Sequence, residues 1–149
     1  RVLFEPHIFS RLTNHRFNDS HPAISYSLWD AGRYPRTQDG RWEQVTEAYA
    51  LAPDEALSAT SWGAFQIMGF QYRTAGYDTV QAFVIDVVRS PQHELAAWAR
   101  WVQASGLVDE IQRKDWAGFA RRYNGASYAE RGYDRLMAEA YARLTTAAN

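Results

Sequence analysis

Along most of the chain, apolar side chains recur every three or four residues, which is the spacing of helices that bury one face. A clear case is the set Trp116, Phe119 and Tyr123. A short extended segment precedes Pro6 at the start of the chain. The sequence therefore predicts a mainly helical domain with a small β element near the N-terminus. The predicted helices cover residues 7–13, 41–50, 53–59, 60–70, 79–89, 91–105, 107–114, 116–123 and 129–147. Asp78 or Thr79 is expected to cap the helix that ends near residue 89, Asp115 is expected to cap the helix over 116–123, and Asn124-Gly125 is expected to end it.

Composition narrows the class of protein. The 149 residues are enough for one domain, and 46% hydrophobic with 22% charged residues are ordinary values for a globular protein. A net charge of −1 argues against a general nucleic-acid or membrane-surface binder. No apolar run approaches the roughly 18 residues of a membrane span.

Metal and cofactor chemistry has little support in the sequence. The chain has no cysteine, which excludes disulfides and thiolate ligands. His7, His15 and His21 lie close together in sequence, but their spacing matches no zinc signature. We expect no metal and no cofactor.

Residues 60–70 are the most informative stretch. The predicted helix there places one amide, Gln66, among large apolar side chains, and burying a lone amide costs a few kcal/mol without partners. Gly63 costs the helix about 1 kcal/mol relative to alanine. Two interpretations remain open: a core helix with a satisfied Gln66, or a helix that lines a cleft and binds a polar ligand.

Two further features are candidates for chemistry. Glu5 lies at a strand-to-helix junction between apolar residues, so it is either a capping carboxylate or one whose pKa is tuned by an apolar cleft. Residues 14–40 are polar, and too long for a simple connection, so they predict a binding rim or lid. Asp19, Asp30, Asp39 and Glu43 lie in or beside this segment as weaker acidic candidates.

Several segments occur in the order seen in one protein family. They are residues 2–9, 21–22, 25–26, 61–69, 114–116 and 123–125. In this order they resemble phage endolysin-type N-acetylmuramidase domains of the lysozyme-like superfamily, over nearly the whole chain. The resemblance implies an α+β lysozyme-like fold, with a helical bundle around a cleft. It also implies a catalytic role for Glu5 and substrate-binding roles for Ser61, Gln66, Tyr123 and Asn124.

The activity implied by the resemblance is cleavage of the β-1,4 bond between N-acetylmuramic acid and N-acetylglucosamine in bacterial peptidoglycan. A Glu would act as general acid, which requires burial to raise its pKa. The alternatives are a lytic transglycosylase and a cell-wall glycan-binding module without activity. A helical interaction or nucleic-acid domain that uses Arg121 and Arg122 is the least favoured, because the net charge is close to zero.

One departure from the family pattern concerns the N-terminus. The resembled domains carry a Glu-Ser-x-Gly element before the Leu-Phe-Glu strand, and this chain begins at Arg1 without it. Glu5 therefore resembles either the second carboxylate or the only acid. We expect one muramidase-like catalytic domain over residues 1–149 that lacks an upstream element. We also expect a monomer, made in the cytoplasm of a bacterial host, that acts on the periplasmic or extracellular cell wall, with Glu5 and Gln66 facing one groove.

Overall fold

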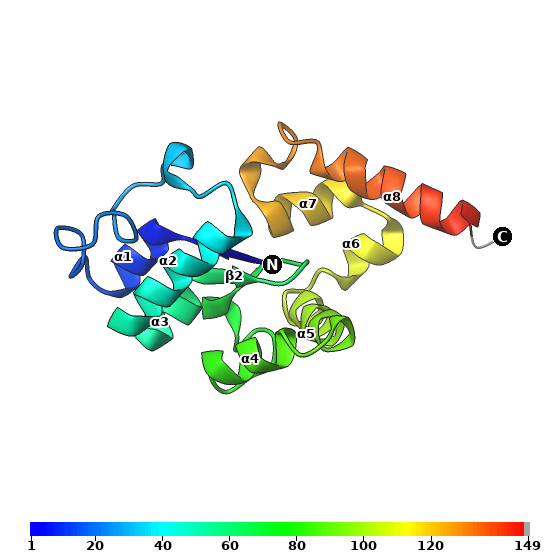
Figure 1. Ribbon diagram of the computed structural model, residues 1–149. Helices are drawn as coiled ribbons and strands as arrows, with labels where there is room; N and C mark the ends of the chain where they lie inside the picture. Colours follow the sequence, from blue (N-terminus) through cyan, green and yellow to red (C-terminus); the bar gives the residue numbers. More distant parts are fainter. Residues whose placement is uncertain (148–149) are drawn as a thin grey trace. The chain divides into compact units, whose positions relative to one another are not determined.

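A computed structural model describes residues 1–147 of the chain, and contacts divide it into two compact units, Arg1–Trp101 and Val102–Asn149. Helices make up most of both units, and the first unit holds a small sheet that includes the N-terminal strand (Figure 1). The prediction of a mainly helical fold with a small β element near the N-terminus is therefore confirmed.

The sheet of the first unit has three short antiparallel strands in the order β1 (Val2–Phe4), β2 (Thr60–Trp62) and β3 (Ile67–Met68). Residues directly opposite each other in a sheet point to the same face, and alternate residues point to opposite faces. The register therefore gives one buried face, formed by Val2, Phe4, Thr60, Trp62 and Ile67, and a second face that carries Leu3, Ser61 and Met68.

The prediction of a helix over residues 60–70 is wrong, because these residues form β2, a turn, β3 and the start of a short 3-10 helix, η2 (Gly69–Gln71). The backbone of Ser61 pairs with Leu3, far away in the sequence, so the hydrogen bonds of this segment come from a distant strand. Gly63 and Gln66 both have left-handed backbone angles, with φ of +76° and +53°. A right-handed helix does not continue through two such residues.

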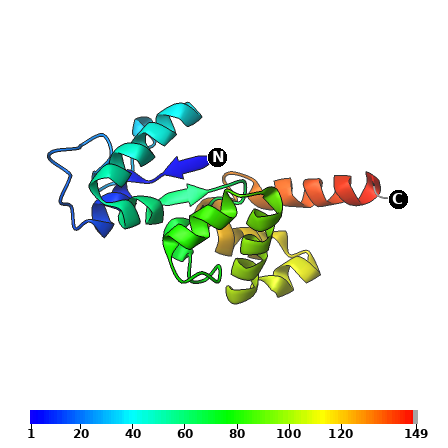
Figure 2. The ribbon, with the colours of Figure 1, turned by 60° about the horizontal axis from the view of Figure 1, so that its bottom comes forward.

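Five α-helices accompany the sheet in the first unit. They are α1 (Pro6–Leu12), α2 (Gln38–Leu51), α3 (Pro53–Ser58), α4 (Val80–Val87) and α5 (Pro91–Ala104), whose last residues enter the second unit. Helix α2 lies along β1 and α3, and α3 also packs against α1 and α4 (Figure 2). The side chains of Phe4, Phe9, Ile24 and Phe83 are fully buried in this unit.

The helix starts follow the capping residues in the sequence. The Thr79 hydroxyl accepts a hydrogen bond from the Ala82 N–H (3.1 Å) at the start of α4, as predicted. Helix α2 begins three residues before the predicted start, because Thr37 caps it by accepting from the Gly40 N–H (3.2 Å).

The described part of the second unit, residues 102–147, contains three α-helices, α6 (Val108–Arg113), α7 (Trp116–Asn124) and α8 (Tyr133–Ala147), and α7 packs against the other two. Asp115 caps α7 through the Gly118 N–H (2.9 Å), as predicted. Helix α8 begins four residues after the predicted start, because Gly132 has a φ of +64°. Within residues 1–147, no helix combines the length and apolar character needed to cross a bilayer.

Candidate active site

Glu5 follows β1 directly and is a largely buried acidic group. Its backbone N–H donates to the Ala59 carbonyl (2.9 Å), which extends the pairing of β1 by one residue. Its side chain is only 15% exposed. Although Glu5 occupies the N-cap position of α1, its carboxylate makes no capping hydrogen bond. The side chain is therefore directed to other partners.

The main partner of Glu5 is Tyr34, whose hydroxyl donates a hydrogen bond to Oε2 of the carboxylate. The Nδ1 atom of His7 lies 3.5 Å from the same oxygen. Burial raises the pKa of Glu5, and the hydrogen bond from Tyr34 partly opposes that rise by stabilising the charged form. Glu5 is thus an acid that holds its proton to a higher pH than an exposed glutamate does.

The two groups beside Glu5 are both neutral around neutral pH. Burial, together with the bond to Glu5, raises the pKa of Tyr34, so its hydroxyl remains a donor. Burial and the nearby Arg11 lower the pKa of His7, which favours the uncharged imidazole. Neither group supplies a positive charge that would hold Glu5 in its ionised form.

The predicted rim, residues 14–40, supplies the aromatic groups around this carboxylate. Tyr34 belongs to it, and the indole of Trp29 lies 6.5 Å from the Tyr34 ring, centroid to centroid. Trp29 is 58% exposed, so one face of the indole is open to solvent. The guanidinium of Arg33 stacks 3.9 Å above the ring of Tyr26. Of these side chains, the exposed indole of Trp29 is suited to stacking on a sugar ring.

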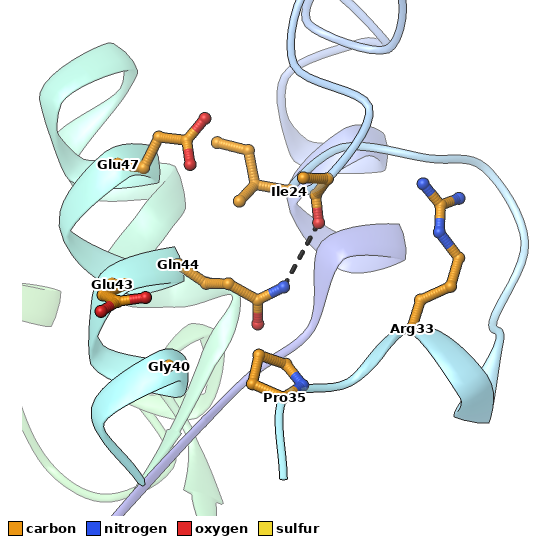
Figure 3. A pocket seen from close by; sticks show the side chains of 8 residues that line it. Ile24, Arg33, Pro35, Gly40, Glu43, Gln44 and Glu47 are labelled. Carbon is orange, nitrogen blue, oxygen red and sulfur yellow. Dashed lines mark hydrogen bonds between the residues drawn. The ribbon is translucent and has the colours of Figure 1, made fainter. Parts of the chain in front are cut away.

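Helix α2 holds the rim in place. The Gln44 side-chain amide donates to the Ala23 carbonyl (3.2 Å), and Arg41 Nε donates to the Pro35 carbonyl (3.2 Å). Figure 3 shows the first of these bonds across a surface pocket of about 540 Å³. Arg33 and Pro35, on either side of Tyr34 in the sequence, both line the pocket, and the bond from Arg41 to Pro35 ties the segment that reaches Glu5 to α2. Asp39 and Glu43, two of the weaker acidic candidates, belong to α2 and line surface pockets there.

His15 and His21 are each hydrogen-bonded to a serine. His15 Nδ1 is hydrogen-bonded to the Ser10 hydroxyl (2.8 Å), and Asn18 Oδ1 accepts from both Ser10 and Ser25 (2.7 Å each). This network fixes the first turn of the rim. In the part of the chain that the structure describes, no group of three His, Cys, Asp or Glu side chains is arranged to hold a metal ion.

Ser61 and Gln66 form one hydrogen-bonded unit on the hairpin. The Ser61 hydroxyl donates to Gln66 Oε1 (3.0 Å), and Gln66 Nε2 donates to the Gly63 carbonyl (2.7 Å). A carboxamide has two N–H donors, and the bond to Gly63 uses one of them. Ser61 shares its sheet face with Leu3, and Glu5 follows Leu3 by two residues, so the alternation of β1 directs Glu5 to the same face.

Tyr123 and Asn124 lie in the second unit, at the last two positions of α7. The Tyr123 ring stacks on Phe119 with the centroids 5.3 Å apart. Gly125 ends the helix with a φ of +86°, as the sequence predicts. The substrate-binding roles of Tyr123 and Asn124 stay predictions, as do those of Ser61 and Gln66.

Tyr34 and Trp29 are the site residues that sequence reasoning did not single out. The available signal was a long polar segment that includes four aromatic side chains, Phe17, Tyr26, Trp29 and Tyr34. Which of these aromatics reaches Glu5 depends on how α2 holds the segment, and no local pattern encodes that.

Comparison with known proteins identifies a family and similar solved structures. The family model Muramidase, described as N-acetylmuramidase, matches residues 1–145. The crystal structure of the Burkholderia AP3 phage endolysin superposes with a TM-score of 0.86 at 36% sequence identity, over 99% of this chain and 56% of that one. The chain thus spans about half the length of that endolysin. No curated protein matches the sequence.

Proposed function

Since the chain belongs to the N-acetylmuramidase family, we propose that it forms the catalytic domain of an enzyme that degrades bacterial peptidoglycan. The bond cleaved is the β-1,4 linkage between N-acetylmuramic acid and N-acetylglucosamine. The observation that carries the proposal is Glu5, a largely buried carboxyl group with a raised pKa beside a rim of aromatic side chains.

The chemistry requires a proton donor for the leaving oxygen of the glycosidic bond. An ordinary glutamate is almost fully ionised at neutral pH, so burial has to raise its pKa before it can act as the acid. Glu5 meets this condition through burial. In the proposed mechanism, protonated Glu5 donates its proton to the leaving oxygen as the bond from that oxygen to the anomeric carbon breaks, and the oxygen of a water molecule takes its place on that carbon. Tyr34 fixes the position of Oε2 through its hydrogen bond.

The other role that the family resemblance allows for Glu5 is that of the second carboxylate, which is ionised during the reaction. The two roles give opposite pH dependences. If Glu5 is the acid, activity falls as the pH rises through its pKa. If it is the second carboxylate, activity falls as the pH drops through the same value. The raised pKa favours the first role, because burial penalises the charged form.

Substrate recognition is assigned to the hairpin and to the end of α7. Ser61 and Gln66 bind an N-acetyl sugar in this proposal, with the second N–H of the Gln66 amide available for a sugar oxygen. Tyr123 and Asn124 keep the sugar-binding roles that the resemblance implies. The enzyme acts as a monomer on the cell wall after synthesis in the bacterial cytoplasm, and uses no cofactor.

The test is digestion of purified peptidoglycan by the complete protein, followed by mass analysis of the soluble products. Hydrolysis yields fragments with reducing N-acetylmuramic acid ends, as the proposal predicts. A lytic transglycosylase yields anhydro ends, each of which lacks one water. A binding module sediments with the peptidoglycan and releases no fragments. Either of the last two results would replace the proposed reaction.

A further inference from the structure

The turn that joins β2 to β3 has an unusual backbone. Residues 63–66 connect the last paired residues, Trp62 and Ile67. Gln66 adopts a left-handed φ of +53°, which costs a residue other than glycine about 1–2 kcal/mol. Such a conformation persists where surrounding contacts impose it.

Helix α5 provides those contacts through Glu94. Its Oε1 atom accepts hydrogen bonds from the backbone N–H groups of Ala64 and of Phe65, the latter at 2.9 Å. Acidic residues in the first turn of a helix usually interact with their own helix end. The carboxylate of Glu94 instead reaches out of α5 to the tip of the hairpin.

Two neighbouring residues complete this arrangement. A Cβ atom at position 63 would overlap the Glu94 carboxylate, so glycine is the residue that lets the carboxylate approach the turn. Trp98, one helical turn after Glu94, stacks on Phe65 with the ring centroids 4.9 Å apart and the planes within 20°. One face of α5 therefore holds the turn in place by both hydrogen bonds and aromatic stacking.

From this geometry we infer that Glu94 is a positioning residue, which acts by fixing the turn that presents the Gln66 amide to the glycan. The inference rests on the proposed function of the hairpin. The inference adds that sugar binding also depends on Glu94, which is not one of the residues proposed to contact the glycan. The Gln66 carboxamide is held by Ser61 and Gly63, so a shift of the turn moves its donor and acceptor groups together.

The experiment compares Glu94→Ala and Glu94→Gln with the wild-type complete protein, with Gln92→Ala on the exposed side of α5 as the matched control. Hydrogen exchange reports on the Ala64 and Phe65 amides, and steady-state kinetics use soluble, uncross-linked peptidoglycan chains. We expect Glu94→Ala to lose protection at both amides. We also expect KM to rise about tenfold or more, with a much smaller change in kcat, since two bonds to a charged acceptor are lost.

Glu94→Gln keeps an oxygen acceptor, so it should recover most of both effects, and Gln92→Ala should change neither. Loss of amide protection in Glu94→Ala without a change in KM would overturn the inference, as would unchanged protection. If Glu94→Ala does not fold, Glu94→Gln takes its place, because the neutral amide oxygen is a weaker acceptor than a carboxylate: a partial loss of protection at the two amides with a rise in KM supports the inference, and a loss of protection without that rise, or unchanged protection, overturns it. Failure of the wild-type protein to act on these chains would refute the proposed function itself, and amide exchange would still show whether Glu94 holds the turn.

Discussion

The hydrogen bond between Tyr34 and Glu5 is a direct point at which to test the proposed acid. Tyr34→Phe removes one hydroxyl and keeps the ring, so packing against the rim is largely retained. In the wild type this hydroxyl donates to the carboxylate and lowers the pKa of Glu5, against the larger effect of burial. Its removal should therefore raise the pKa of Glu5 further.

The size of the effect follows from the strength of the bond. A hydrogen bond to a charged group is worth about 1.5–3 kcal/mol, so loss of this bond should raise the pKa of Glu5 by an amount that titration resolves. Solvent screening reduces this little, because the Glu5 side chain is only 15% exposed. If Glu5 is the acid, the alkaline limb of the kcat/KM profile moves upward by the same amount.

Two assays check this prediction. NMR titration of the Glu5 carboxyl carbon measures its pKa directly, and the pH profile of peptidoglycan hydrolysis measures its role. Tyr49→Phe, at an exposed position on α2, is the matched control and should leave both unchanged. A Glu5 pKa that stays constant or falls in Tyr34→Phe would refute the account of the hydrogen bond. A shifted pKa with an unshifted alkaline limb would refute the role of Glu5 as acid.

Three further predictions concern stability. Folded Glu5 has a pKa above that of the unfolded chain, so it destabilises the wild type increasingly as the pH rises through the interval between the two values. Glu5→Gln cannot ionise, so it does not lose stability in this way. Calorimetry over a pH series should show the Tm of Glu5→Gln rising relative to the wild-type Tm as the pH increases across that interval. A higher Tm only at lower pH would contradict the conclusion that burial raises the pKa of Glu5. Gly63→Ala should lower the free energy of unfolding by about 2–4 kcal/mol in urea titrations, through left-handed strain and displacement of Glu94, and a near-neutral result would mean that the turn relaxes freely. Phe9→Ala should cost about 3–5 kcal/mol by denaturant unfolding, because Phe9 is 0% exposed and packs against Phe4; a loss below about 1 kcal/mol would exclude a central place in the core.

The helical part of the fold was predictable because its signals are local. Periodic apolar residues gave most of the helices, and Thr79, Asp115 and Gly125 marked ends that the structure confirms. The resemblance to endolysin-type muramidase domains, a class of glycoside hydrolase, is confirmed at the level of the family and of the lysozyme-like fold. That conclusion depended on the order of several motifs along the chain.

The segment at residues 60–70 was not predictable in the same way. Strand β2 has three residues, too few to show a period-2 pattern, and Leu3, which pairs with Ser61, lies 58 residues earlier in the chain. The apolar side chains that suggested a helix serve instead on the two faces of a hairpin. Gly63, which counted against a helix, is explained by the approach of Glu94.

The same distinction between local signals and distant contacts applies to the residues of the site. Glu5 was recognisable from its position at a strand-to-helix junction and from the motif around it. Its partner Tyr34 comes from a segment without regular structure, whose path is set by hydrogen bonds to α2. The contact between Tyr34 and Glu5 is therefore a product of tertiary packing.

The central claim is that the carboxyl group of Glu5 does the chemistry, and the activity of Glu5→Gln in the complete protein tests it most directly. Release of soluble fragments from purified peptidoglycan should fall by about 100-fold or more, as expected on losing a general acid, while sedimentation with peptidoglycan and the circular dichroism spectrum stay unchanged. Glu139→Gln, at an exposed ion pair on α8, should retain wild-type activity. Full lytic activity in Glu5→Gln would contradict the account.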